Sequence, residues 1–137
     1  MKRRNFIKNG TAAVALTGTG MLVSNDLSGN TFSKQGSLIH YVLFWLKPGL
    51  SESEVTRFSG FFEELKKIKT VRSLQYGRPA PTGKREVVDN SFTYSMIATF
   101  SSVEEHESYQ KDQKHLDAIA TFGDHWEKVV VHDTLVK

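Results

Sequence analysis

The sequence predicts an α+β domain of the ferredoxin-like type, with the element order β-α-β-β-α-β. Three observations lead to this prediction. Four segments of strand character are separated by two segments whose apolar residues recur at helical spacing. The helical segments stand in the first and the third of the three connections between strands. All three prolines lie in expected connections. We therefore expect a four-stranded antiparallel sheet with both helices on one face.

The first strand is expected at residues 38–47, LIHYVLFWLK, which are almost continuously apolar and are followed by Pro48 and Gly49. A run of this kind is typical of a strand that is buried on both faces. Because successive side chains point to opposite faces, the run presents two surfaces. One consists of His40, Val42, Phe44 and Leu46, and the other of Ile39, Tyr41, Leu43 and Trp45.

The first helix is expected to begin after Ser51. Glu54 stands three residues later, and the two residues form the pattern of a capping box. Apolar residues then recur at helical spacing as far as about Lys69, which predicts one helix with an apolar face. These residues are Val55, Phe58, Phe61, Phe62, Leu65 and Ile68.

The second half of the domain follows the same pattern. Residues 71–78 are the expected second strand, and a polar loop at 79–91 leads to the third strand at 92–100. On that strand Phe92, Tyr94, Met96, Ala98 and Phe100 alternate onto one face. A second helical region is expected to run to about residue 122, with a break near residues 112–114. The last strand is expected at residues 126–136.

The patterning also predicts a homodimer. Two helices cover only one face of a four-stranded sheet, yet the first strand and most of the last are apolar on both faces. The simplest cover for the second face is the sheet of another copy, related by a two-fold axis. The alternative is that the N-terminal linker covers this face, but that linker is polar.

Composition fits one folded domain and excludes several functions. Of the 137 residues 39% are hydrophobic and 24% are charged. The chain has no cysteine, which excludes disulfides, thiolate catalysis and cysteine-ligated zinc. Residues 1–36 hold five basic residues and one acidic residue, a net charge of +4, so the remainder carries −1 of the total of +3. The domain itself therefore offers no electrostatic case for a nucleic-acid partner.

The N-terminus resembles an export signal. Arg3 and Arg4 are followed by NFIK, and this order is similar to the twin-arginine (Tat) motif. The apolar run at residues 11–23 is too short to span the roughly 20-residue hydrocarbon core of a membrane. We therefore expect a signal peptide at residues 1–24, a flexible linker at 25–36 and the folded domain at 37–137. The mature protein is expected outside the cytoplasm, in the periplasm, without a stable membrane anchor.

Tyr109 and His115 are the candidate catalytic residues. On an unbroken helix, six residues would leave them roughly 120° apart. If Asp112 caps a new helix, both side chains could point at the sheet face that carries His40 and Tyr94. A histidine titrates near neutral pH and a tyrosine hydroxyl can donate to an oxyanion. The pair suits enolate chemistry, namely aldol closure, lactonisation or isomerisation. The alternative is a packing tyrosine and a solvated histidine.

Residues 38–136 resemble the stress-responsive A/B barrel domain (Dabb) family. The similarity rests on the opening segment HYVLFWLKPG and on FTYSMIATFSSVEEHESYQKDQKH and WEKVVVHD, which contain His40, Phe100, Tyr109, His115 and Asp133. The resemblance implies a dimeric α/β barrel with His115 as general base and Tyr109 as the group that orients the substrate or stabilises an oxyanion. Gln113 departs from the family, which commonly has proline there.

The expected pocket lies between the helices and the sheet. His40 and Tyr94 are its expected walls, and the apolar lining is expected from Phe44, Met96, Phe100 and Phe122. No cofactor and no metal site are expected, because His106, His125 and His132 show no metal-ligand spacing and suit a structural or surface role.

These residues lead to three hypotheses. The first is a cofactor-free cyclase or lyase that acts on an apolar or aromatic small molecule. The second is a stress-associated protein that binds such a molecule without turning it over. The third is a monooxygenase or haem-handling relative of the same dimeric barrel.

Overall fold

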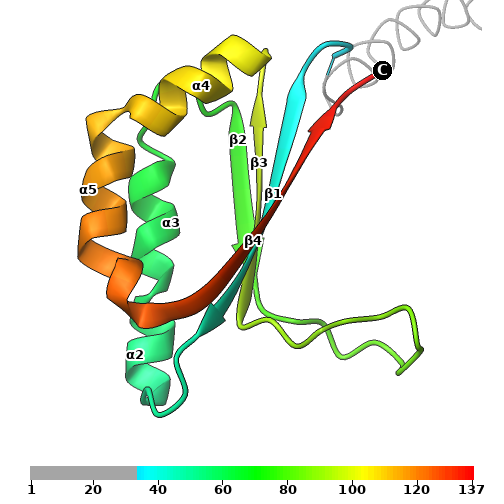
Figure 1. Ribbon diagram of the computed structural model, residues 1–137, viewed down its shortest axis with the longest axis vertical. Helices are drawn as coiled ribbons and strands as arrows, with labels where there is room; N and C mark the ends of the chain where they lie inside the picture. The colour runs from blue at the N-terminus through cyan, green and yellow to red at the C-terminus, as the bar shows by residue number, and fades with distance from the viewer. Residues whose placement is uncertain (1–33) are drawn as a thin grey trace, which may run out of the picture. The chain divides into compact units, whose positions relative to one another are not determined.

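The computed structural model describes residues 34–137 and confirms the α+β fold (Figure 1). The four strands form one antiparallel sheet in the order β2-β3-β1-β4. The helices α2, α3, α4 and α5 lie on one face of this sheet (Figure 1). The elements are β1 (Leu38–Leu46), α2 (Glu52–Arg57), α3 (Ser59–Leu65), β2 (Ser73–Gly77), β3 (Tyr94–Phe100), α4 (Val103–Lys111), α5 (Gln113–Phe122), the 3₁₀ turn η1 (Gly123–His125) and β4 (Trp126–Leu135).

Two predictions concern residues outside this range. The export signal at 1–24 and most of the linker at 25–36 precede residue 34, so they stay predictions. Within residues 34–137, no helix has both the length and the apolar character needed to cross a membrane.

β1 is the central strand of the sheet and alternates in burial as its sequence predicts. His40, Val42, Phe44 and Leu46 are buried under the helices, and the residues between them are half-buried. The register places His40 opposite Asp133 of β4, and Val42 opposite Val131. Side chains of paired residues lie on the same face of a sheet, so β1 and β4 together present a floor to the helices.

The first helical region differs from the single helix expected as far as Lys69. It consists of α2 and α3, which meet at Phe58, and it ends at Leu65. The predicted capping box is present, because Ser51 and Glu54 exchange hydrogen bonds of 3.1 and 2.7 Å. Ser59 and Gly60 follow the junction, and both are weaker helix formers than alanine. Beyond Leu65 the backbone continues in i→i+3 turns, which still bury Ile68.

Gly60 explains how closely α3 and α5 pack. A Cβ atom at this position would lie 3.0 Å from the Phe122 ring. The ring occupies the space that any larger residue at position 60 would need. The missing side chain at position 60 thus leaves room for the Phe122 ring of α5 against α3.

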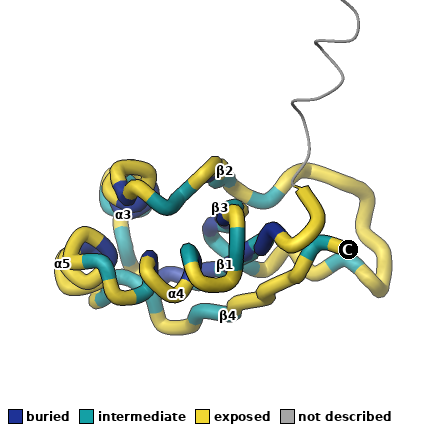
Figure 2. The backbone as a smooth tube through the Cα atoms, turned by 90° about the horizontal axis from the view of Figure 1, so that it is seen from above, coloured by how far each residue is buried: buried dark blue, intermediate teal, exposed yellow. Residues whose placement is uncertain are grey.

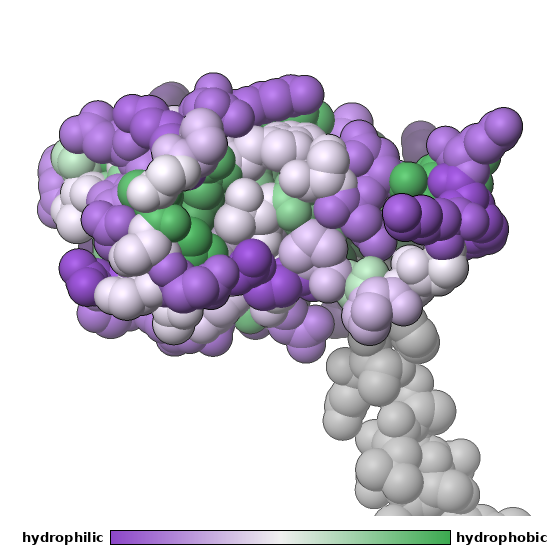
Figure 3. Space-filling model, turned by 90° about the horizontal axis from the view of Figure 1, so that it is seen from below, coloured by the Kyte–Doolittle hydropathy of each residue, from purple (hydrophilic) through white to green (hydrophobic). Residues whose placement is uncertain are grey.

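The core lies between the helices and the sheet, where Figure 2 shows the buried residues. Its centre is aromatic: the Phe44 ring meets Phe58, Phe61 and Phe62 edge-to-face at centroid distances of 5.5–5.6 Å. Such pairs contribute roughly 0.5–1.5 kcal/mol each beyond the burial of their area. Seen from the end at which α2 lies, hydrophobic residues also reach the surface in a patch on the helical side (Figure 3).

Among residues 34–137, no helix lies on the opposite face of the sheet (Figure 1). Ile39, Tyr41, Leu43 and Trp45 are only half-buried there, and Ile97 on β3 is 45% exposed. The face is therefore apolar along its central strand β1, as the patterning predicts.

Candidate functional site

Tyr109 and His115 meet because the second helical region breaks where the sequence predicts. Asp112 ends α4 and caps α5, with an extended backbone (φ −62°, ψ 137°) and a side chain that accepts a 2.8 Å hydrogen bond from Lys114 N. The rings of Tyr109 and His115 lie 4.5 Å apart between centroids, at an angle of 51°. A continuous helix would have kept them on different faces.

Both side chains line a cavity of about 180 Å³ between the helices and the sheet. An apolar cavity of about 150 Å³ is sufficient to hold benzene. The cavity therefore has room for a compact molecule of about one ring. Its lining consists of His40, Val42, Phe44, Phe61, Leu65, Met96, Tyr109, Gln110, His115, Ile119, Trp126, Val129 and Val131.

The polar groups of the lining are few. His40, Tyr109, Gln110 and His115 supply them, and the other lining residues are apolar. His40 contacts Tyr109 at a ring distance of 5.9 Å, and Tyr109 contacts His115. The cavity thus has a few polar side chains that contact one another in an otherwise apolar lining, as most small-molecule sites do.

His115 is buried and its Nδ1 atom has no hydrogen-bond partner among residues 34–137. Burial lowers the pKa of His115 below its usual 6.5, because the charged form loses its solvation. The ring is therefore neutral at pH 7 and able to accept a proton. Burial also raises the pKa of Tyr109 well above its usual range, so the hydroxyl stays protonated and can donate.

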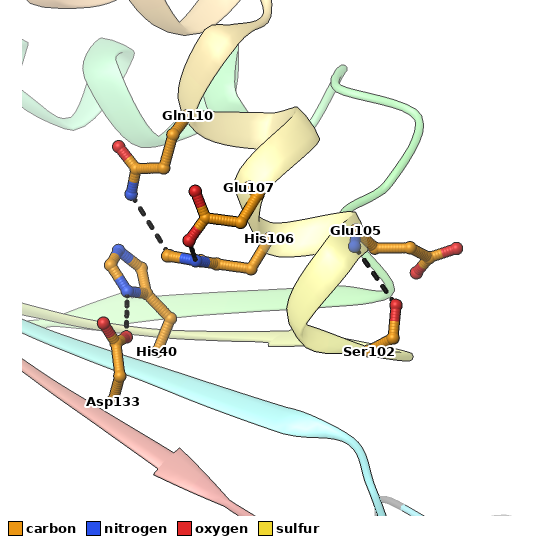
Figure 4. A network of polar contacts seen from close by, with 7 residues as sticks. All are labelled: His40, Ser102, Glu105, His106, Glu107, Gln110 and Asp133. Atoms are coloured by element: carbon orange, nitrogen blue, oxygen red, sulfur yellow. Dashed lines mark hydrogen bonds and ion pairs between the residues drawn. The ribbon is translucent and has the colours of Figure 1, made fainter.

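His40 is held by a residue of the last strand. Its Nδ1 lies 2.6 Å from Oδ1 of Asp133, as Figure 4 shows. Burial is the largest influence on His40 and lowers its pKa, although Asp133 opposes the shift. The pair is therefore a neutral imidazole that donates its Nδ1–H to a carboxylate, and this bond fixes the orientation of the ring.

The structure separates the predicted pocket residues into two groups. His40, Phe44, Met96, Tyr109 and His115 line the cavity. Tyr94, Phe100 and Phe122 were expected there as well, and they do not line it.

Each of these three side chains has another role. The Tyr94 hydroxyl donates to Val55 O at 2.9 Å, which fastens β3 to α2. Phe100 packs against the His106 ring, and Phe122 lies over Gly60. Burial on the helical side of the sheet is therefore not the same as access to the cavity.

The sequence did not predict the contributions of Gln110, Trp126, Val129 and His106. Only Trp126 and Val129 could have been expected to line the cavity, because they lie at the start of the last strand, which pairs with β1. His106 was expected in a structural or surface role, and it is buried with its ring 4.8 Å from that of His40. The two histidines lie 66 positions apart in the chain, and no local spacing connects them.

The sequence matches the model of the Stress responsive A/B Barrel Domain over residues 38–136. The chain belongs to this family. No curated protein matches the sequence significantly. The Dabb fold is shared with solved structures of low sequence identity.

One of these structures is a hydroxynitrile lyase from Passiflora edulis, which is 20% identical with a TM-score of 0.65 and covers 76% of this chain and 96% of that one. A dimeric protein of unknown function from Bacteroides fragilis is 20% identical with a TM-score of 0.59, over 74% and 97%. The cofactor-independent oxygenase SnoaB from Streptomyces nogalater is 10% identical with a TM-score of 0.54, over 74% and 94%. These likenesses establish the ferredoxin-like fold of the chain.

Proposed function

We propose that this Dabb protein is an exported homodimeric enzyme of the cyclase or lyase type. It acts on a compact apolar or aromatic molecule, with His115 as general base and Tyr109 as hydrogen-bond donor. One observation carries the proposal: a neutral histidine with an unpartnered buried nitrogen lies against a protonated tyrosine at the wall of an apolar cavity. Perturbed titratable groups that meet in a cavity are typical of active sites.

The chemistry requires only these two side chains. His115 takes a proton from a carbon next to a carbonyl, and the Tyr109 hydroxyl donates to the oxygen on which negative charge develops. The carbanion attacks a second carbonyl carbon of the same molecule and forms a carbon–carbon bond. The resulting alkoxide then takes back the proton from His115. The reverse sequence breaks a carbon–carbon bond, which is lyase chemistry.

The cavity limits the substrate class. Its volume of about 180 Å³ suits a molecule of about one ring, and its few polar groups suit one or two oxygen or nitrogen atoms. A solved protein of the same fold is a hydroxynitrile lyase, and small cyanohydrins have this size and polarity. Cyanohydrins and compact dicarbonyl compounds are therefore the first substrates to test.

The open face of the sheet supports the homodimer. No helix of the described part of the chain covers its half-buried apolar residues on β1, and a solved protein of this fold is described as dimeric. Sheet-to-sheet association would cover this face. Native mass spectrometry should show twice the mass of the processed chain, and Leu43→Lys, which places a charge at the centre of the face, should give a monomer.

Export by the twin-arginine route belongs to the same proposal and rests on residues 3–8. Replacement of Arg3 and Arg4 by lysine should keep the protein in the cytoplasm, as measured by cell fractionation. An exported double variant would contradict the route.

The enzyme hypothesis is tested with a defined panel. Mandelonitrile cleavage is followed by the release of benzaldehyde, and proton abstraction from compact dicarbonyls is followed by deuterium incorporation in D₂O. His115→Ala and Tyr109→Phe should each lower the rate by about 10²–10⁴-fold, the usual worth of a general base or an oxyanion donor. Lys114→Ala, an exposed neighbour on α5, is the matched control and should retain full activity.

The alternatives give different results on the same panel. A ligand that raises the melting temperature without turnover, and whose effect His115→Ala weakens, would favour the binding protein. Oxygen consumption would favour the oxygenase. Rates that are equal in wild type and His115→Ala would contradict the proposed base.

A further inference from the structure

A second group of side chains adjoins the cavity and has no role in the proton transfers proposed above. It consists of His40 on β1, His106 on α4 and Asp133 on β4 (Figure 4). Each offers one nitrogen or carboxylate oxygen, and the three atoms lie within 4.8 Å of one another. Three separate elements of the fold converge at this point.

Two buried imidazoles lie side by side in this group, and each has one ring nitrogen in a hydrogen bond, to Asp133 and to Gln110. His40 is 4% exposed and His106 is 6% exposed, and their rings lie 4.8 Å apart. Burial of polar rings costs free energy unless their nitrogens are bound. One carboxylate next to two buried imidazoles is a donor set that Zn²⁺ and similar divalent cations accept.

We propose that His40, His106 and Asp133 bind a divalent transition-metal cation such as Zn²⁺. The proposal goes beyond the proposed function, because proton transfer by His115 does not require a metal. His40 is shared, since it also lines the cavity. A cation at this position would adjoin the polar part of the substrate.

The distances are close to those of a metal site. Ligand atoms at about 2.0–2.2 Å from a tetrahedral zinc lie roughly 3.3 Å apart. His40 Nδ1 and Asp133 Oδ1 are now 2.6 Å apart and share a proton, which a cation would replace. The widest separation, within 4.8 Å, closes by about 1.5 Å with side-chain adjustment.

The lone pair of His106 is oriented by a neighbour. The amide nitrogen of Gln110 lies 3.1 Å from His106 Nε2, and because an amide nitrogen only donates, Nε2 accepts. A cation bound through Nε2 would take this lone pair in place of the Gln110 N–H, so the amide has to turn away when a metal binds. Until then Gln110 holds the His106 ring in place.

A cation could reach the site from solvent. The Asp133 side chain is 41% exposed on the edge strand β4, although both histidines are buried. The carboxylate is thus able to meet a hydrated cation first, and the two imidazoles complete the coordination. Their own orientation is already set by Asp133 and Gln110.

The test uses the full chain without an affinity tag, treated with a chelator and then dialysed. Co²⁺ is added and its visible absorption bands report the ligand set, while Zn²⁺ is measured by competition and by calorimetry. We expect one cation per chain. The melting temperature, measured during the same cation titration, gives an independent readout. A cation that binds only the folded state raises the melting temperature.

The variants are His106→Gln and Asp133→Asn, which retain most of the shape of each side chain. Each should weaken Co²⁺ binding by more than about 100-fold, since even changes behind the ligands cost about 10–100-fold. His132→Gln is the matched control, because His132 precedes Asp133 on β4 and is exposed. It should bind as the wild type does.

Two results would overturn the inference. One is a wild-type protein whose melting temperature and Co²⁺ spectrum do not respond to the cation. The other is binding that survives in both His106→Gln and Asp133→Asn, or that His132→Gln weakens equally. The first result is measured on the wild-type protein alone. The proposal can therefore be refuted even if a variant does not fold.

Discussion

The two helical regions of this domain occupy equivalent positions over one sheet and do different things. In the first region, α3 and the Phe58 junction before it bury phenylalanines and a leucine, which build the core. α4 and α5 bury His106, Tyr109, His115 and Ala118, and they supply polar groups to the site. The comparison shows how one supersecondary pattern serves both the core and the polar wall of the cavity.

The backbone at the two breaks accounts for much of the difference. Phe58, between α2 and α3, has helical dihedral angles (φ −57°, ψ −24°), so the apolar stripe continues across the junction. Asp112, between α4 and α5, is extended, so the side chains of α5 do not continue the helical spacing of α4. As a result His115 points to the same cavity as Tyr109.

The largest expected effect is a loss of stability caused by a substitution in the core of the first helical region. Phe62 is fully buried and contacts Phe44, Tyr76 and Tyr94. Phe62→Ala should lower the free energy of unfolding by about 3–5 kcal/mol, because it leaves a cavity in an aromatic cluster. Urea denaturation measures this loss. Thr56→Ala, at an exposed position of α2, should change stability little, and a similar loss there would refute the assignment of the core.

The next effect compares the two helix caps directly. Ser51 caps α2 and Asp112 caps α5. Ser51→Ala and Asp112→Ala should each cost about 0.5–2 kcal/mol of stability. Only Asp112→Ala should also disturb ligand binding and turnover, because that cap sets the position of His115. Equal activity in the two variants would show that the break at Asp112 does not control the site.

A third, smaller effect concerns the pH dependence of stability. Burial is the main cause that lowers the pKa of His115, with His40 and His106 assisting and the Gln110 backbone and Asp112 opposing. The unfolded chain therefore takes up the proton at a higher pH than the folded protein. Wild type should lose stability as the pH falls from 6.5 towards the lowered value, and it should keep this contribution above 6.5.

His115→Gln removes this titration and isolates it. The stability of wild type relative to His115→Gln should decrease as the pH falls, measured in chelator by thermal unfolding. If this difference in stability stays constant between pH 8 and pH 5, unfolding takes up no proton through His115. That result would contradict the lowered pKa.

The smallest expected effect lies on the exposed side of the first region. Lys67 forms a 2.8 Å ion pair with Glu64 one turn earlier, and both side chains are about half-exposed. Lys67→Ala should change the free energy of unfolding by less than about 0.5 kcal/mol, since solvent screens such pairs. A loss above about 1 kcal/mol in urea denaturation would mean that this face is covered in the assembled protein.

Much of the fold was predictable because it depends on local pattern. The alternation of Val42 and Phe44 with Leu43 identifies the central strand, and the Ser51–Glu54 box marks the start of α2. The break at Asp112 was also predictable, because aspartate is a preferred helix cap. The end of the first helix was not, because i→i+3 turns still bury Ile68 and so preserve the helical spacing of apolar residues beyond Leu65.

The site was predictable only in part. Tyr109 and His115 stand out by their chemistry and their distance from Asp112. Phe122, by contrast, is apolar at helical spacing and still lies outside the cavity, because the packing of α3 on α5 directs it to Gly60. Which of two neighbouring apolar residues reaches the cavity depends on contacts between distant elements, and the helical spacing of apolar residues does not reveal those contacts.

The sequence by itself determined the order of the elements, the two faces of β1 and the break that brings Tyr109 to His115, because each depends on residues within a few positions of one another. Only the tertiary structure decided that Asp133 binds His40 and that His106 lies beside them. Those contacts follow from the pairing of β1 with β4 and from the docking of α4, which join residues far apart in the chain.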